Sequence, residues 1–180
     1  MENITTSEKN KMAALYGLIL GIIYLAIYTA CNIFVGKFLA FYVAKFVGYV
    51  LFFIIMGVLA TRIKKANGGF IEFREIFGAI FIMILVSELI YMVYNFIYYK
   101  YIDPQFMEKM KYAYNTFMES FKIPDDKLEE ANKSMDKAMA EVKTFNLLNN
   151  IKSYLSIIIM DSLFGLLVCL AVRKSRPVFE

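Results

Sequence analysis

The sequence predicts an all-α integral membrane protein: a four-helix bundle with an extracytoplasmic antiparallel helical hairpin between spans three and four. Hydrophobic residues make up 59% of the 180-residue chain, whereas about 45 to 50% is usual in soluble domains. The excess falls into four long stretches with few charges. Since a spanning helix needs roughly 20 apolar residues, the chain has room for four spans and one further small element.

We expect a single membrane domain over residues 1–180, with spans at residues 12–36, 38–61, 74–100 and 152–172. Thr5-Thr6-Ser7-Glu8 has the form of a helix capping box and predicts the start of the first helix. Asn67-Gly68-Gly69 predicts a turn before the third span.

The distribution of basic residues predicts the orientation of the spans. All four arginines lie on the side of the two termini, while the short loop between spans one and two has only Lys37 and Lys45 nearby. Because Lys and Arg near span ends are retained in the cytoplasm, both termini are expected to be cytoplasmic. The segment between spans three and four would then lie outside.

Residues 103–148 have the pattern of a helical hairpin. Asp103-Pro104 predicts a helix start, and Ile123-Pro124-Asp125-Asp126 predicts the turn. Apolar residues recur every three or four positions on each side of the turn: Phe106, Met110, Ala113, Phe117 and Phe121, then Leu128, Ala131, Met135, Ala138, Val142 and Phe145. We expect two helices standing roughly 30 Å off the membrane, which either close on each other or bind a second copy or another membrane protein.

Glu88 and Asp161 are the only acids deep in the predicted spans. They should face inward, because a carboxylate facing lipid at mid-bilayer costs at least a few kcal/mol. Tyr24 and Tyr28 of the first span, and Tyr91 and Asn95 of the third, lie on polar stripes that could hydrogen-bond them. Small residues predict close helix packing at Gly17, Gly21 and Gly165. Two interpretations stay open: protonated acids that hold helices together, or a site that handles protons or cations.

Composition excludes several other functions. The chain has no histidine, so it lacks a Ser-His or Cys-His nucleophile and imidazole metal ligands. Cys31 and Cys169 are isolated in apolar stretches, and we expect no metal site, no cofactor and no enzymatic activity. No basic run exceeds Lys64-Lys65, so nucleic acid is not an expected partner. Membrane lipid is the partner that the composition requires.

Three segments of the chain resemble a known family. They are Gly68-Gly69-Phe70-Ile71-Glu72-Phe73-Arg74-Glu75-Ile76-Phe77 before span three, Tyr98-x-x-x-Ile102-Asp103-Pro104-x-Phe106 after it, and the polar helical insert before the last span. Together, over residues 8–174, they resemble the small bacterial membrane proteins grouped as domain of unknown function 4199. The resemblance implies a four-span protein of the bacterial inner membrane and supplies no catalytic or ligand residues.

Two functional hypotheses follow. The first is a non-catalytic scaffold, sensor or accessory subunit that associates with itself or a partner through the hairpin. The second is a small oligomeric transporter or channel that uses Glu88 and Asp161 to move protons or cations. Four spans are few for an alternating-access carrier, which usually contains paired repeats, so transport would require an oligomer.

Overall fold

A computed structural model describes residues 4–121, 125–143 and 147–175. Over these residues the chain is all-α, as predicted, apart from an isolated bridge between Ile71 and Lys174. The helices are α1 (Thr6–Cys31), α2 (Phe38–Ala66), α3 (Phe73–Ile97), α4 (Phe106–Ser120), α5 (Asp125–Lys143) and α6 (Leu147–Val172). A 3-10 turn, η1 (Asn32–Phe34), follows α1, and a π-helical turn, η2 (Tyr98–Ile102), follows α3.

Four segments are long and apolar enough to cross a membrane, which confirms the predicted number of spans. They are Thr6–Phe34, Phe38–Ala66, Phe73–Ile102 and Ile151–Val172. In the bundle, α1 and α6 each pack against both α2 and α3. Large apolar side chains such as Phe46, Ile54 and Leu163 are exposed on the outside of the bundle, where lipid would surround them.

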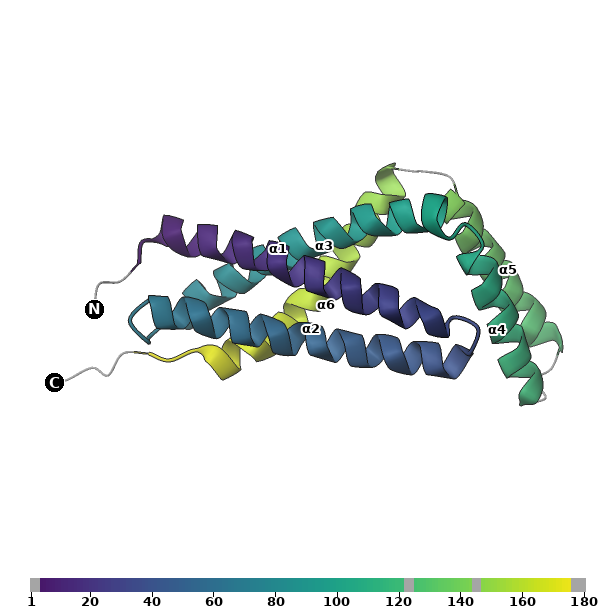
Figure 1. The fold of residues 1–180 in the computed structure, drawn as a ribbon, viewed down its shortest axis with the longest axis horizontal. Coiled ribbons are helices and arrows are strands. Elements are labelled where there is room, and N and C mark those ends of the chain that lie inside the picture. The colour runs from purple at the N-terminus through teal and green to yellow at the C-terminus, as the bar shows by residue number, and fades with distance from the viewer. Residues whose placement is uncertain (1–3, 122–124, 144–146, 176–180) are drawn as a thin grey trace.

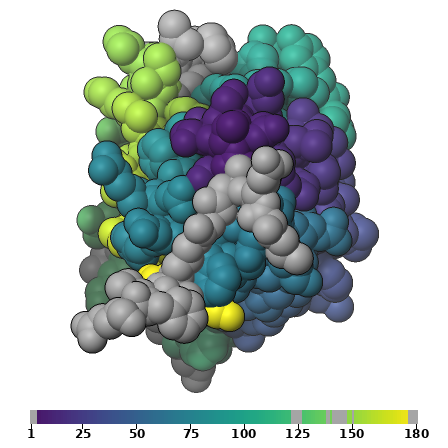
Figure 2. Space-filling model, turned by 90° about the vertical axis from the view of Figure 1, so that its left-hand side faces the viewer, coloured from purple at the N-terminus to yellow at the C-terminus, as the bar shows by residue number. Residues whose placement is uncertain are grey.

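The start of α1 and the end of α6 lie at the same end of the bundle (Figure 1). Thr5 and Glu8 form the predicted capping box at the start of α1. Lys9 of α1 is paired with Glu75 at the start of α3, and Figure 2 looks onto this end, where the first turns of α1 lie beside the chain around the α2–α3 connection. The predicted turn at Asn67-Gly68-Gly69 is also present, with positive φ at both glycines.

This end of the bundle is closed by apolar packing. Ile71 and Lys174 exchange two backbone hydrogen bonds of 2.9 and 3.0 Å, which tie the start of α3 to the end of α6. Lys64 donates to the carbonyl of Val172 over 2.9 Å. Fully buried side chains fill the space between these ties and the middle of the bundle: Leu20, Met56, Ile63, Ile76, Ile80 and Met83.

Glycines allow the helices to approach closely where α3 meets α1 and α6. A Cβ atom at Gly17 would lie 2.9 Å from both the carbonyl oxygen of Met83 and the Cβ of Val86. At Gly165 it would lie 3.1 Å from Ile80 Cγ2. Such contacts are too tight for a larger residue unless the helices separate, so glycine sets these interhelical distances.

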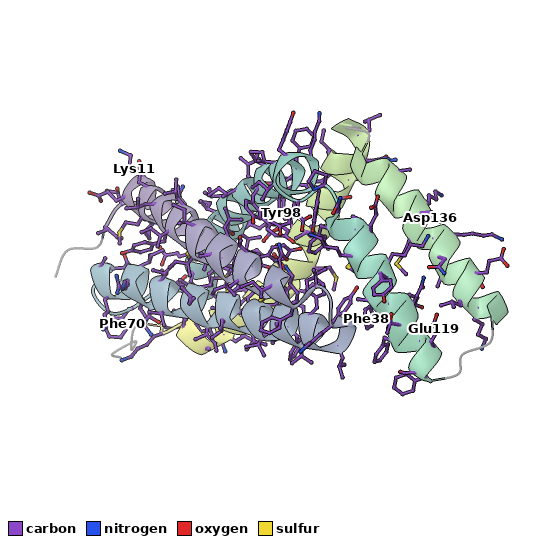
Figure 3. The ribbon with its side chains drawn as sticks, turned by 45° about the vertical axis from the view of Figure 1, so that its right-hand side comes forward. Lys11, Phe38, Phe70, Tyr98, Glu119 and Asp136 are labelled. Carbon is purple, nitrogen blue, oxygen red and sulfur yellow. The ribbon has the colours of Figure 1, made fainter. Side chains whose placement is uncertain are left out.

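Helices α4 and α5 lie side by side across the other end of the bundle (Figure 1). The sequence had suggested that these two helices project along the bundle axis, but in the structure they lie across it. The reason is an aromatic contact with the start of α2: the ring of Phe38 lies 5.2 Å from Tyr114 and 5.0 Å from Phe117, centroid to centroid. Figure 3 shows Phe38 next to α4.

The start of α4 also differs from the prediction. The helix begins at Phe106, after Gln105, so the expected Asp103-Pro104 start is two residues early. Instead of capping the helix, the Asp103 carboxylate pairs with Lys109 at 2.9 Å. The N-terminus of a helix carries only a partial positive charge, whereas lysine carries a full one. The Asp103 carboxylate therefore pairs with Lys109 rather than with the helix end.

Close α1–α3 packing gives the first testable prediction. Gly17→Ala should destabilise the protein by about 1 to 3 kcal/mol, because the new methyl group meets backbone atoms of α3. Gly78→Ala is the matched control, since nothing lies within 4 Å of a Cβ at Gly78. Unfolding in mixed micelles measures both, and equal stability of the two variants would contradict the packing described.

Candidate functional site

The two deep acids face each other inside the bundle. Glu88 of α3 is 3% exposed and Asp161 of α6 is 1% exposed, and their carboxyl groups lie within hydrogen-bonding reach of one another. The hydroxyl of Tyr49, from α2, donates to Asp161 Oδ1 over 2.5 Å. Three helices therefore meet at one carboxyl pair.

A shared proton explains how this pair is tolerated. Asp161 Oδ2 is buried and has no donor within the part of the chain that the structure describes. Two adjacent buried carboxylates would also repel each other strongly. One proton held between Glu88 and Asp161 would supply the missing donor and leave the pair with a single negative charge.

Helix packing brings the two acids together. Gly165 lies one helical turn from Asp161, and a Cβ there would lie 3.2 Å from Ile84 Cδ1, one turn from Glu88. Because α6 can approach α3 at this glycine, the next turn of each helix places the carboxyl groups at the same level. The predicted packing glycine and the predicted acids are thus parts of one arrangement.

A cavity of about 320 Å³ lies against the carboxyl pair. All four spanning helices contribute to its wall: Tyr24, Tyr49, Glu88, Tyr91, Ser156, Ile157, Met160 and Asp161. Glu88 and Asp161 are buried, whereas Ile157 and Met160 are 37% and 53% exposed. The acids therefore lie at the inner wall, and the α6 residues mark the mouth on the flank of the bundle.

Tyrosines continue from this cavity toward the hairpin end. The rings of Tyr91 and Tyr28 meet edge to face at 4.8 Å, and the Tyr28 hydroxyl lies 3.2 Å from that of Tyr99. Phe106 at the start of α4 packs on Tyr99, with ring centroids 5.2 Å apart. The opposite direction is filled by apolar side chains, so the polar groups near the acids extend to one end of the bundle.

Other predicted polar residues are placed around this tyrosine series. The side chains of Asn95 and Tyr91 lie within hydrogen-bonding reach on the same face of α3. The ring of Tyr24 lies 5.4 Å from that of Tyr91 and 4.9 Å from that of Phe52. Tyr24 and Tyr91 therefore line the cavity, while Tyr28 and Asn95 lie on its hairpin side.

Sequence reasoning missed Tyr49 and Lys45 as partners in the core. The amine of Lys45 donates to Asn32 Oδ1 over 2.7 Å and to the carbonyl of Tyr28 over 3.2 Å. Helix α2 is apolar on nearly every side, so no polar stripe identified its inward face. The one signal in the sequence for the inward face of α2 was the position of Tyr49, which follows Gly48 and lies at the depth of the two acids.

The hairpin residues are divided between two environments. Phe106 is buried, Met110 and Phe117 are partly buried against the bundle end, and Phe121 is 63% exposed. On α5, Leu128 and Met135 are partly buried. A 2.5 Å ion pair between Lys111 and Asp136 joins the two helices. The side chain of Val142 and all of Phe145 lie outside the described residues.

These features define a multi-pass helical membrane protein with a carboxyl pair at the wall of an intramembrane cavity. Within the described ranges, no group of three or more Asp, Glu, Cys or His side chains is arranged to hold a metal ion. The family model described as "Protein of unknown function (DUF4199)" matches residues 15–174. The chain therefore belongs to this family, which confirms the resemblance read from the sequence. No curated protein and no solved structure matches it.

The shared proton gives a prediction about stability. Glu88→Gln should cost less than about 1 kcal/mol, because the amide can donate to Asp161 as the protonated acid does. Glu88→Leu has a similar volume but no donor, and should cost about 1 to 3 kcal/mol more than Glu88→Gln. Unfolding in mixed micelles at neutral pH compares the two variants. Equal losses would mean that no hydrogen bond joins the carboxyl groups.

Proposed function

We propose that the protein binds and releases a proton, or a cation in its place, at the Glu88–Asp161 pair, and acts as a small oligomeric transporter. The observation that carries the proposal is the meeting of two buried carboxyl groups at the wall of a cavity of about 320 Å³. We propose no catalytic role for the cavity, whose wall contains neither histidine nor cysteine among the described residues.

The competing interpretation is that the acids only hold helices together. That role favours acids packed tightly among other side chains, because empty space beside them loses packing contacts. The cavity of about 320 Å³ beside Glu88 and Asp161 supports exchange with a ligand instead.

We propose that the protein lies in the bacterial cytoplasmic membrane with both termini inside. The concentration of basic residues near the ends of α2 and α6 supports this orientation, as at Arg62, Lys64, Lys65 and Arg173. It places α4 and α5 on the outside and makes the tyrosine series the outer approach to the acids.

Association through the hairpin is a second candidate function, compatible with the first because a four-span transporter would need an oligomer. Tyr112 is 74% exposed and Phe121 is 63% exposed, and both lie outside the four candidate spans. Exposed aromatic side chains are favourable contacts in protein interfaces. A second copy of the chain or another membrane protein is the partner that we propose for this surface.

Carbodiimide labelling tests the proton site. Dicyclohexylcarbodiimide dissolves in lipid and adds to a protonated carboxyl group, so it should modify Glu88 or Asp161 in native membranes. Labelling should slow as the pH is raised, because deprotonation removes the reactive form. Peptide mass analysis identifies the modified residue.

Two variants provide the controls for this experiment. Labelling should disappear in the double variant Glu88→Gln with Asp161→Asn, and should persist in Glu119→Gln, which changes an exposed hairpin acid. Unlabelled wild-type protein, or equal labelling of the double variant, would refute the proposed proton site.

A cysteine at an exposed α5 position tests the orientation and the hairpin contact. In intact cells, Ser134→Cys should react with an impermeant maleimide, because we place α5 outside. Oxidation of the same membranes should give a disulfide-linked dimer if two hairpins associate. Protection from the maleimide until the cells are opened would reverse the orientation, and the absence of a dimer under oxidation would count against self-association.

A further inference from the structure

We propose that the cavity beside Glu88 and Asp161 binds a small lipophilic ammonium ion, which enters from the bilayer. This inference rests on the proposed proton site and goes further by naming the class of ligand. Three properties of the cavity carry it: its volume, the groups in its wall and the position of its mouth.

The volume of the cavity is far larger than a proton-binding site requires. A water molecule occupies about 30 Å³ in the liquid, and ligand pockets begin near 300 Å³. At about 320 Å³, the cavity falls at the lower end of the range for organic ligands. A proton or a bare alkali-metal ion would leave most of this space empty.

The wall has the chemistry of an organic cation site. Tyr24, Tyr49 and Tyr91 come from three different helices and line the same space, and aromatic faces attract ammonium groups, most strongly where water is excluded. Asp161 is 1% exposed and lines this cavity together with Glu88. A monovalent cation would neutralise the single negative charge that remains when the acids share one proton.

Within the described ranges, no lysine or arginine is among the residues that line this cavity. Lys45 lies inside the second span, and its amine donates hydrogen bonds to Asn32 and to the carbonyl of Tyr28. Its charge also lies 2.6 Å from the centre of the Tyr28 ring. The molecule thus already contains one ammonium–tyrosine contact, and the cavity offers a second set of tyrosines without such an occupant among the described residues.

The mouth indicates the route of entry. Ile157 and Met160 are exposed on the flank of α6, inside the candidate span Ile151–Val172, and Figure 1 shows α6 diverging from α2 toward the hairpin end. A ligand at this flank would come from the hydrocarbon or its interface. The ligand therefore needs an apolar part, which excludes strongly hydrated cations.

Protonation should compete with the ligand. At low pH the pair binds a second proton, which removes the charge that attracts the ammonium ion. The affinity for the ammonium ion should therefore rise with pH over the range in which this second proton dissociates. The other titratable groups near the acids are Tyr24 on α1, Tyr49 on α2, Tyr91 on α3 and Tyr154 on α6. They stay neutral across the neutral range and do not reverse this direction.

Benzyltrimethylammonium is the probe for a direct binding test. The full chain is placed in nanodiscs of uncharged lipid, and binding is measured by calorimetry against neopentylbenzene, in which a carbon replaces the charged nitrogen. We expect saturable binding of one ammonium ion per chain, with the neutral compound at least roughly tenfold weaker because it lacks the charge that the rings and carboxylate attract. Affinity should fall as the pH is lowered.

Matched variants separate binding from folding. Asp161→Asn should weaken ammonium binding, whereas Glu119→Gln on the hairpin should not. Tyr91→Phe keeps a ring and should retain most of the affinity, whereas Tyr91→Leu should lose it. Equal binding of the charged and neutral compounds, or unchanged affinity in Asp161→Asn, would overturn the inference.

The outcome is distinct from that of the carbodiimide test. If the acids are labelled but benzyltrimethylammonium does not bind, the ammonium site is refuted and the proton site stands. If the ammonium ion binds at this cavity but neither acid is labelled at any pH, the site takes cations without holding a proton; the ammonium site then stands and the proposed proton site is refuted.

Discussion

The structure depends on two acids, Glu88 and Asp161, that must be accommodated side by side inside an apolar bundle. A carboxylate without a hydrogen-bond donor at this depth would lose its hydration without compensation, because the interior has a low dielectric constant. Their mutual contact and the Tyr49 hydroxyl replace that hydration. Since the three residues come from three helices, their contact requires α2, α3 and α6 to meet at one level.

Small residues let the helices come close enough for the contact between Glu88, Asp161 and Tyr49, and aromatic residues surround the side of this contact that faces the hairpin. Gly165 lets α6 approach α3 one turn from the acids, while the apolar end near the termini is closed by buried aliphatic side chains. The tyrosine series extends the other way, until Phe106 of α4 covers Tyr99. The hairpin therefore contacts the outermost tyrosine of the series, and the two hypothetical functions, association and proton handling, concern adjacent parts of one molecule.

Much of this organisation was predictable because it depends on local or compositional signals. Apolar length gives the four spans, the Thr5–Glu8 capping box gives the start of α1, and the cost of burying charge directs Glu88 and Asp161 inward. Tyr49 could not be assigned, since α2 lacks a polar stripe. The direction of the hairpin could not be predicted either. The spacing of its apolar residues shows that α4 has an apolar face, but it does not show that Phe38 of α2 packs against that face. The cavity is lined by residues of α1, α2, α3 and α6 together, and no pattern within one helix reveals such a shared space.

The central claim is that Glu88 and Asp161 hold a proton between them at neutral pH. Infrared spectroscopy of the protein in lipid tests it directly, because a protonated carboxyl group has a C=O band separate from those of carboxylates. We predict such a band at neutral pH, shifted in D2O, absent from the double variant Glu88→Gln with Asp161→Asn and retained in Glu119→Gln. The account would be contradicted by a wild-type spectrum at neutral pH without this band, or by an unchanged band in the double variant.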